Sequence, residues 1–189
     1  MTEHTGERYR CIVADPPWLE RGGGKIRRGA DRHYPIMRTH QIIETMLRAP
    51  CWSPDDSGCH LWLWVTDGKL PDGLEVMQAL GFRYIRTMVW VKDRIGLGQY
   101  LRGQHEICLL GVRGRLPALS RSEPSVVTAA RRKHSQKPEE SYRRIEAVSP
   151  GPRLEMFARS TRVGWDSWGN QVADDPQISL GIQAEENNS

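Results

Sequence analysis

Short apolar runs alternate with amphipathic segments along this chain, and this alternation restricts its fold more than any other feature. Residues 9–14, 59–65 and 84–91 are rich in β-branched and aromatic side chains and predict strands. Between them lie residues 71–80 and a segment that begins at an expected N-cap, Thr39, and both have apolar side chains at helical spacing. Strand and helix in alternation are typical of a mostly parallel sheet with helices on both faces. The sequence therefore predicts an α/β fold.

The same pattern continues in the second half of the chain. Residues 107–112 predict another strand, residues 138–148 a helix with Pro138 in its first turn, and residues 153–158 a following strand. Two stretches rich in Gly and Arg, residues 19–38 and 93–104, have no periodicity and predict loops. Loops of this length usually serve a function or lack fixed structure.

A single domain over residues 1–172 is expected, because a chain of 189 residues can bury one continuous core. Residues 173–189 carry four acids and no base, and they predict a disordered acidic tail. Residues 1–172 therefore hold 27 bases against 19 acids. This surplus suits a polyanionic partner held through phosphate contacts, although proteins that bind no nucleic acid also show it.

The cysteines indicate a reducing, cytoplasmic setting. None of the four belongs to a CxxC pair, and Cys11 and Cys108 lie in apolar runs where a thiol acts as a small hydrophobe. Cys51, Cys59 and His60 lack a fourth ligand at a suitable spacing, so no metal site is predicted. The sequence also shows neither the apolar region of a signal peptide nor an apolar stretch long enough for a bilayer, and no membrane contact is expected.

The tetrapeptide Asp15-Pro16-Pro17-Trp18 directly follows the first predicted strand. Its prolines fix φ and end the strand, so the tetrapeptide taken alone is a structural turn beside a buried Trp. Its place at the carboxyl end of a strand favours a catalytic role, because ligands of such sheets bind there. The Asp15 carboxylate and a Pro16 carbonyl free of competing pairing would accept the two hydrogens of an amino group such as N6 of adenine. Trp18 would stack on the extruded base.

Several segments in this order resemble the adenine-N6 methyltransferases. That family includes the catalytic subunit of the eukaryotic mRNA adenosine methyltransferase and many bacterial and phage DNA-modifying relatives. The resemblance runs from about Tyr9 to Val172 and rests on residues 14–18, 34–37, 61–65, 89–92, 96–98, 104–106, 135–140 and 164–171. It implies a Rossmann-like, S-adenosylmethionine-dependent methyltransferase core in permuted order, in which the catalytic turn precedes the elements that hold the cofactor.

The residues and the resemblance together predict three sets of site residues, and no metal ligands are among them. The catalytic set is Asp15, Pro16, Pro17 and Trp18. The cofactor set comprises Asp15, Lys137, Arg159, Asn170 and Gln171. Its cations would bind the methionine carboxylate or a ribose oxygen, and its amides would bind the ribose or base edges. The substrate set comprises Trp18, a lid residue Tyr34, Lys92, Arg102, His105, Glu106, Arg131, Arg132 and Lys133. No role is assigned to Thr161 or Arg162.

For two segments of the substrate set, a structural role is the alternative to substrate contact. His105-Glu106 either orients the active-site loop or is structural. Arg131-Arg132-Lys133, in the basic irregular stretch 113–137, either contacts a nucleic-acid backbone or forms a solvated face.

The expected function is transfer of a methyl group from S-adenosylmethionine to adenine N6 in nucleic acid, by a monomer or a homodimer. DNA is preferred to RNA as substrate because compact, single-domain versions of the pattern resemble the bacterial and phage members. An RNA adenosine N6 methyltransferase and a non-catalytic nucleic-acid-binding partner subunit remain alternatives, as does methyl transfer to a small molecule or a protein amide.

Overall fold

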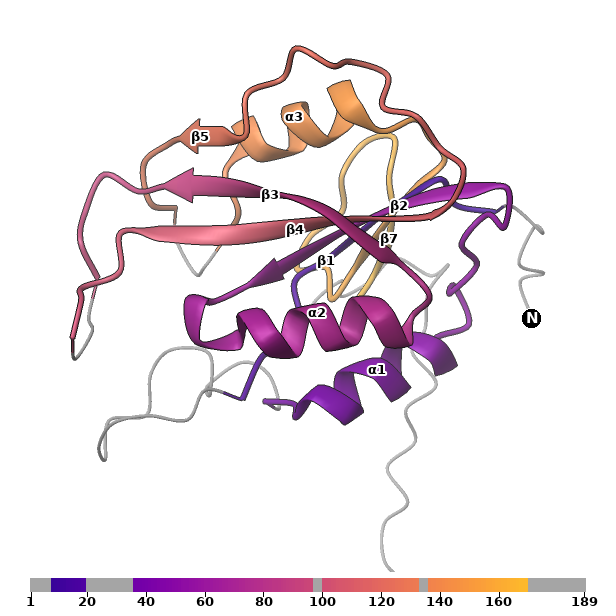
Figure 1. Cartoon of the computed structure of the whole chain (residues 1–189), viewed down its shortest axis with the longest axis horizontal. Helices are drawn as coiled ribbons and strands as arrows, with labels where there is room; N and C mark the ends of the chain where they lie inside the picture. The colour runs from indigo at the N-terminus through magenta and orange to yellow at the C-terminus, as the bar shows by residue number, and fades with distance from the viewer. Residues whose placement is uncertain (1–7, 20–35, 97–99, 133–135, 170–189) are drawn as a thin grey trace, which may run out of the picture.

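The computed structural model describes residues 8–19, 36–96, 100–132 and 136–169, and within them one mixed sheet has the strand order β5-β3-β4-β2-β1-β6-β7 (Figure 1). The strands of this sheet are β1 (Cys11–Ala14), β2 (Gly58–Val65), β3 (Arg83–Val91), β4 (His105–Gly114), β5 (Val126–Thr128), β6 (Arg153–Met156) and β7 (Asp166–Trp168).

Most neighbouring strands are parallel, as the alternation predicted. β1 pairs in parallel with β2 and β6, β3 with β5, and β6 with β7. β4 is antiparallel to both of its neighbours, β2 and β3. The carboxyl ends of six strands therefore meet the amino end of β4 along one side of the sheet, which we call the carboxyl edge.

Helices cover both faces of the sheet (Figure 1). α1 (Thr39–Arg48) and α2 (Leu70–Ala79) lie on one face, and α3 (Glu139–Val148) lies on the other. Successive strand side chains point to opposite faces, so β1 contributes to two cores. Ile12 is buried in the core that contains Ile42 of α1, and Val13 in the core that contains Ile145 of α3.

Two short strands and the start of two helices differ from the sequence predictions. Pro138 is the extended N-cap of α3 and not a residue of its first turn. β5 lies in a stretch expected to be irregular and β7 in one without a predicted strand, because a three-residue strand is too short to show periodicity. Thr39 is the first helical residue rather than the N-cap. The N-cap is Arg38, whose backbone N–H donates to Gln41 Oε1 at 2.8 Å, while the Thr39 hydroxyl donates to Asp72.

All four cysteines are buried and free. Burial raises the pKa of Cys11 and of Cys51 to about 12, so these thiols act as small apolar side chains, as predicted for Cys11. Among the described residues, no cluster of His, Cys, Asp or Glu is arranged to hold a metal ion. None of the helices within the described ranges is both long and apolar enough to cross a membrane.

Candidate active site

The Asp15-Pro16-Pro17-Trp18 turn leaves the sheet where β1 ends, at the carboxyl edge. The Pro17 carbonyl accepts the Met37 N–H at 2.8 Å, which holds the turn against the residues before α1. The expectation of an unpaired Pro16 carbonyl is wrong, because that oxygen accepts the Trp18 N–H at 2.9 Å. Since a carbonyl oxygen has two lone pairs, Pro16 keeps one for a ligand.

Trp18 lies in the hydrophobic core and not at the surface of the turn. Its side chain is 7% exposed, and its indole N–H donates to the Trp64 carbonyl at 2.9 Å. A buried indole needs such a partner, and the end of β2 supplies it. The expectation that Trp18 offers a ring face to a base is therefore not met in this conformation. The contacts show Trp18 anchoring the turn to the core.

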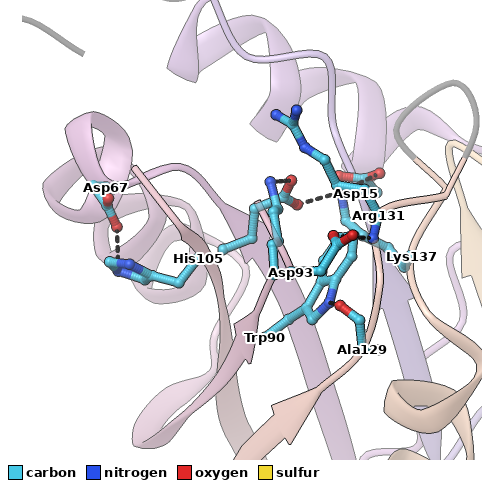
Figure 2. Close-up of polar contacts among 10 residues, drawn as sticks. Asp15, Asp67, Trp90, Asp93, His105, Ala129, Arg131 and Lys137 are labelled. Carbon is cyan, nitrogen blue, oxygen red and sulfur yellow. Dashed lines mark hydrogen bonds and ion pairs between the residues drawn. The ribbon is translucent and has the colours of Figure 1, made fainter. Parts of the chain in front are cut away.

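Four charged side chains from distant parts of the chain meet at the carboxyl edge. Lys137 Nζ lies 2.8 Å from Asp15 Oδ2 and 3.0 Å from Glu106 Oε2. Lys92 Nζ lies 2.6 Å from Glu106 Oε1. Figure 2 shows Lys137 beside Asp15. We call these four residues the charge network. The sequence singled out all four, and the fold brings them together.

The charge network is largely shielded from water, and its ion pairs favour the charged forms of Lys137 and Glu106. Burial by itself would lower the pKa of Lys137, whose side chain is 8% exposed, but Asp15 and Glu106 raise that pKa above its ordinary value. Burial would raise the pKa of Glu106, but Lys137 and Lys92 hold it below its ordinary value. Lys137 also lies 5.1 Å from the ring centroid of Trp64, and this contact favours the cation.

A pocket of about 210 Å³ opens beside Asp15 and Lys137. Arg159 also lines it, so three residues of the predicted cofactor set surround one cavity. The other two, Asn170 and Gln171, lie outside the described residues. The remaining lining residues are Arg132, Gln136, Tyr142, Glu155, Phe157, Ser160 and Arg162.

Glu155 and Tyr142 are pocket residues that the sequence analysis missed. The Tyr142 hydroxyl donates to Glu155 Oε1 at 2.5 Å. Burial raises the pKa of both groups, so the pocket holds a carboxyl group that binds protons more readily than usual. Glu155 stands opposite Val13 in the parallel pairing of β6 with β1. The available signal was an acidic side chain inside a predicted strand, residues 153–158, and the structure ends that strand at Met156, which places Glu155 near the carboxyl end where ligands of such folds bind.

Arg162, which received no role from the sequence, covers one side of this pocket. Its guanidinium lies 3.7 Å from the ring centroid of Tyr142, and two of its nitrogens lie 2.6 and 3.0 Å from the carboxylate oxygens of Glu139. Glu139 belongs to the first turn of α3. Arg162 therefore connects the segment after β6 to the start of α3 across the pocket.

His105 lies away from the Asp15 carboxylate. Its Nε2 is 3.0 Å from Asp67 Oδ1, and in Figure 2 this pair is separated from Asp15 and Lys137. This contact ties the start of β4 to the turn after β2, which favours the orienting role over direct substrate contact. The predicted substrate residues Tyr34 and Lys133 lie outside the described residues.

The predicted arginines lie around the same edge. Arg102 Nε donates to the Gly96 carbonyl at 2.9 Å. The Arg131 backbone N–H donates to Asp93 Oδ1 at 2.9 Å, as Figure 2 shows. Arg132 lines the pocket. Of these three arginines, Arg132 therefore borders the same pocket as Asp15 and Lys137.

The chain is similar in sequence to known methyltransferases. A putative N(6)-adenosine-methyltransferase MT-A70-like protein of Medicago truncatula is 30% identical over 94% of this chain, which covers 28% of that relative. The human N(6)-adenosine-methyltransferase catalytic subunit METTL3 is 30% identical over 87% of the chain, which covers 28% of the human protein. The type II methyltransferase M.MunI of Mycoplasma is 28% identical over 95% of the chain, which covers 84% of that relative. Residues 9–171 match the MT-A70 family model, and the chain therefore belongs to the MT-A70 family.

Proposed function

We propose that this chain is an S-adenosylmethionine-dependent methyltransferase that acts on N6 of adenine in nucleic acid. The observation that carries the proposal is the position of Asp15, which is held by Lys137 at 2.8 Å and borders the pocket. A carboxylate in this place lies beside both a ligand cavity and the strand ends where substrates of α/β proteins bind. The names of the MT-A70 relatives support the choice of reaction.

Asp15 would hold the amino group of the target adenine. That nitrogen is a weak nucleophile because its lone pair is delocalised into the ring. Lys137 fixes Asp15 through Oδ2, so Oδ1 would accept one N6 hydrogen, and the second lone pair of the Pro16 carbonyl would accept the other. Two fixed acceptors draw the nitrogen toward a tetrahedral shape and aim its lone pair at the incoming methyl group.

The pocket residues fit the proposed cofactor. When bound, S-adenosylmethionine supplies an electrophilic methyl group on a sulfonium. Arg159 would pair with its carboxylate, and Glu155 would bind the ribose hydroxyls, since a carboxyl group with a raised pKa can both donate and accept hydrogen bonds. Phe157 offers an apolar surface in the same pocket. Asn170 and Gln171 complete the proposed cofactor set.

The fold would then be a Rossmann-like methyltransferase core with its motifs in permuted order. Supporting this description, the catalytic turn follows the first strand, while the other pocket residues come from the later segment around α3 and β6. β6 returns to pair with β1, which places late and early segments side by side. One domain over residues 1–172 and a cytoplasmic location belong to the same proposal.

DNA is the proposed polymer, with RNA as the alternative. The chain covers 84% of the type II methyltransferase M.MunI but 28% of the human N(6)-adenosine-methyltransferase subunit. The likeness to M.MunI extends over most of that relative, and on this ground we keep DNA as the proposed polymer. Purified protein should therefore transfer labelled methyl groups to DNA more rapidly than to RNA of the same base sequence. Absence of N6-methyladenine from both polymers would reject the enzymatic proposal.

Replacing the catalytic carboxylate tests the mechanism directly. Asp15→Asn keeps the size of the side chain but gives a weaker acceptor, so kcat should fall by at least about a hundredfold. S-adenosylmethionine binding, measured by calorimetry, should persist in the variant. Asp56→Asn is the matched control, because Asp56 pairs with Arg8 and Arg113 at the surface. Full turnover by Asp15→Asn would contradict this role, and absence of cofactor binding by the natural chain would favour a non-catalytic partner subunit.

A further inference from the structure

The hairpin between β3 and β4 extends beyond the sheet at the carboxyl edge (Figure 1). The Lys92 N–H donates to the Gln104 carbonyl at 2.8 Å, and the Gly96 N–H donates to the Gly103 carbonyl at 2.6 Å. The two arms therefore continue the pairing of their strands. We call its described residues, 92–96 and 100–104, the finger.

Apolar side chains of the finger face solvent. Tyr100 is 100% exposed, Leu101 is 88% exposed and Ile95 is 50% exposed. Single exposed apolar residues are common in soluble proteins, but the finger carries three of them within one short hairpin, and such a concentration is typical of an interaction surface. These residues lie in the sequence between Lys92 and Glu106, two members of the charge network.

Cations lie among these apolar side chains. Arg94 has a side chain that is 82% exposed, and Arg102 is exposed on the opposite arm. The segment that carries Arg131 is fixed beside the finger by two contacts, from Trp90 Nε1 to the Ala129 carbonyl at 2.9 Å and from the Arg131 N–H to Asp93 Oδ1 (Figure 2). Proteins bind single-stranded nucleic acid with side chains of these two kinds. Aromatic rings stack on the bases, and cations pair with the phosphates.

The finger is joined to the proposed catalytic carboxylate through a chain of contacts. Lys92 is its first residue, and the Lys92 ammonium pairs with Glu106, which pairs with Lys137 and so with Asp15. An adenine whose N6 reaches Asp15 has to leave the stack of its neighbours. Apolar side chains that take over stacking with those neighbours offset part of that cost.

We propose that Tyr100 and Leu101 form a stacking surface for the bases that flank the target adenine, with Arg94, Arg102 and Arg131 on the adjacent phosphates. This inference rests on the proposed function and deepens it. The occupant of the surface is a polynucleotide, because the cations of the finger and of the Arg131 segment outnumber the single acid, Asp93, among them.

Paired serine substitutions test the stacking surface. Tyr100→Ser with Leu101→Ser should weaken the binding of labelled oligodeoxyadenylate, followed by fluorescence anisotropy, roughly 5- to 150-fold for each stacked base lost. Net charge is unchanged, so the dependence of affinity on salt should keep its slope. Tyr100→Phe should bind as the natural chain does. Leu119→Ser is the matched control, because Leu119 is 63% exposed and follows the far end of β4.

The outcomes separate this inference from the proposed function. If the double variant binds the oligonucleotide as tightly as Leu119→Ser, the stacking surface is refuted. The same conclusion follows if light scattering shows that Tyr100 and Leu101 hold two copies of the chain together while oligonucleotide affinity is unchanged. If the double variant binds weakly but the natural chain methylates neither DNA nor RNA, the stacking surface is supported and the proposed function is rejected.

Discussion

Lys137 has two carboxylates within hydrogen-bonding distance, so one ammonium group balances two acids that are mostly buried. Removing it leaves Asp15 without its ion-pair partner and leaves Glu106 with Lys92 as its one remaining partner in the charge network. Lys137→Met should therefore destabilise the fold by about 3–5 kcal/mol near neutral pH, the usual cost of breaking a buried ion pair. Lys137→Arg keeps the charge and should lose much less stability. Urea unfolding measures both.

The pH dependence of that loss follows from Glu106, whose pKa is held below its ordinary value of 4.5. A group with a lowered pKa contributes stability above its ordinary pKa, and the contribution disappears as the pH falls through the lowered value. The deficit of Lys137→Met should therefore be largest near neutral pH and shrink below about pH 4.5. A deficit that is independent of pH would argue against the charge network. Lys69→Met, which removes the ion pair to the partly exposed Asp72 but leaves its hydrogen bond from Thr39, is the control.

The pKa of Glu155 is shifted in the opposite direction to that of Glu106. Burial raises its pKa, so its contribution to stability is present below its ordinary value of 4.5 and is lost as the pH rises through the raised value. Glu155→Gln keeps an acceptor for the Tyr142 hydroxyl and removes the titration. Its melting temperature should exceed that of the natural chain near neutral pH by roughly 2–4 °C, as for about 1 kcal/mol in a chain of this size. Calorimetry below about pH 4.5 should show no difference.

The control for Glu155→Gln is Glu75→Gln, since Glu75 is exposed on α2. That variant should have the same melting temperature as the natural chain at every pH. A destabilised Glu155→Gln at neutral pH would show that the ionised carboxylate is itself stabilising. Its affinity for S-adenosylmethionine should fall, because Gln presents one acceptor oxygen to the two ribose hydroxyls, whereas the carboxyl group presents two oxygens.

At the scale of elements, Gly73 lets α2 lie close to β2 and β4. A Cβ added at Gly73 would lie 2.6 Å from Val65 Cγ1 and 3.1 Å from Leu109 Cδ1. Gly73→Ala should destabilise the fold, because overpacking costs about 1–3 kcal/mol while the gain in helix propensity is at most about 1 kcal/mol. Gly68→Ala is the control, since its Cβ would meet nothing within 4 Å. Equal melting temperatures for the two variants would contradict this packing.

The longer elements could be predicted from the sequence because their side chains repeat with the period of a strand or a helix. The prediction failed at β5 and β7, whose three residues offer no period. It also failed at Thr39, where a hydrogen bond to Asp72, 33 residues away, competes with local capping. Local patterns therefore identified the elements, while contacts across the fold decided their ends.

The site was predicted where a residue belongs to a recognisable motif. Asp15, Lys92, Glu106 and Lys137 were selected in this way, and the structure brings them into contact. Glu155, Tyr142 and Arg162 were missed because their place in the pocket depends on the pairing of β6 with β1, which the sequence does not reveal. The burial of Trp18 likewise depends on a carbonyl at the end of β2.

At the scale of the whole molecule, the prediction concerns the net charge of the chain. Residues 173–189 carry four acids and no base, so their deletion raises the net charge from +4 to about +8. Binding to oligodeoxyadenylate should become tighter at low salt, and the difference should shrink as salt screens it. Melting temperature and cofactor affinity should not change if residues 1–172 form the domain. Loss of either would place the domain boundary later in the chain.

The backbone pairing of Lys92 with Gln104 also makes the finger replaceable. Both arms leave the sheet from this one pair of residues, so a hairpin of other length or composition can be grafted between them while the ends of β3 and β4 stay in place. Asp15, the proposed catalytic acid, lies outside the grafted segment. On the proposal made above, the segment that holds the polynucleotide and the residues that carry the chemistry are encoded in separate stretches of chain, so evolution could diversify the first while it inherits the second unchanged.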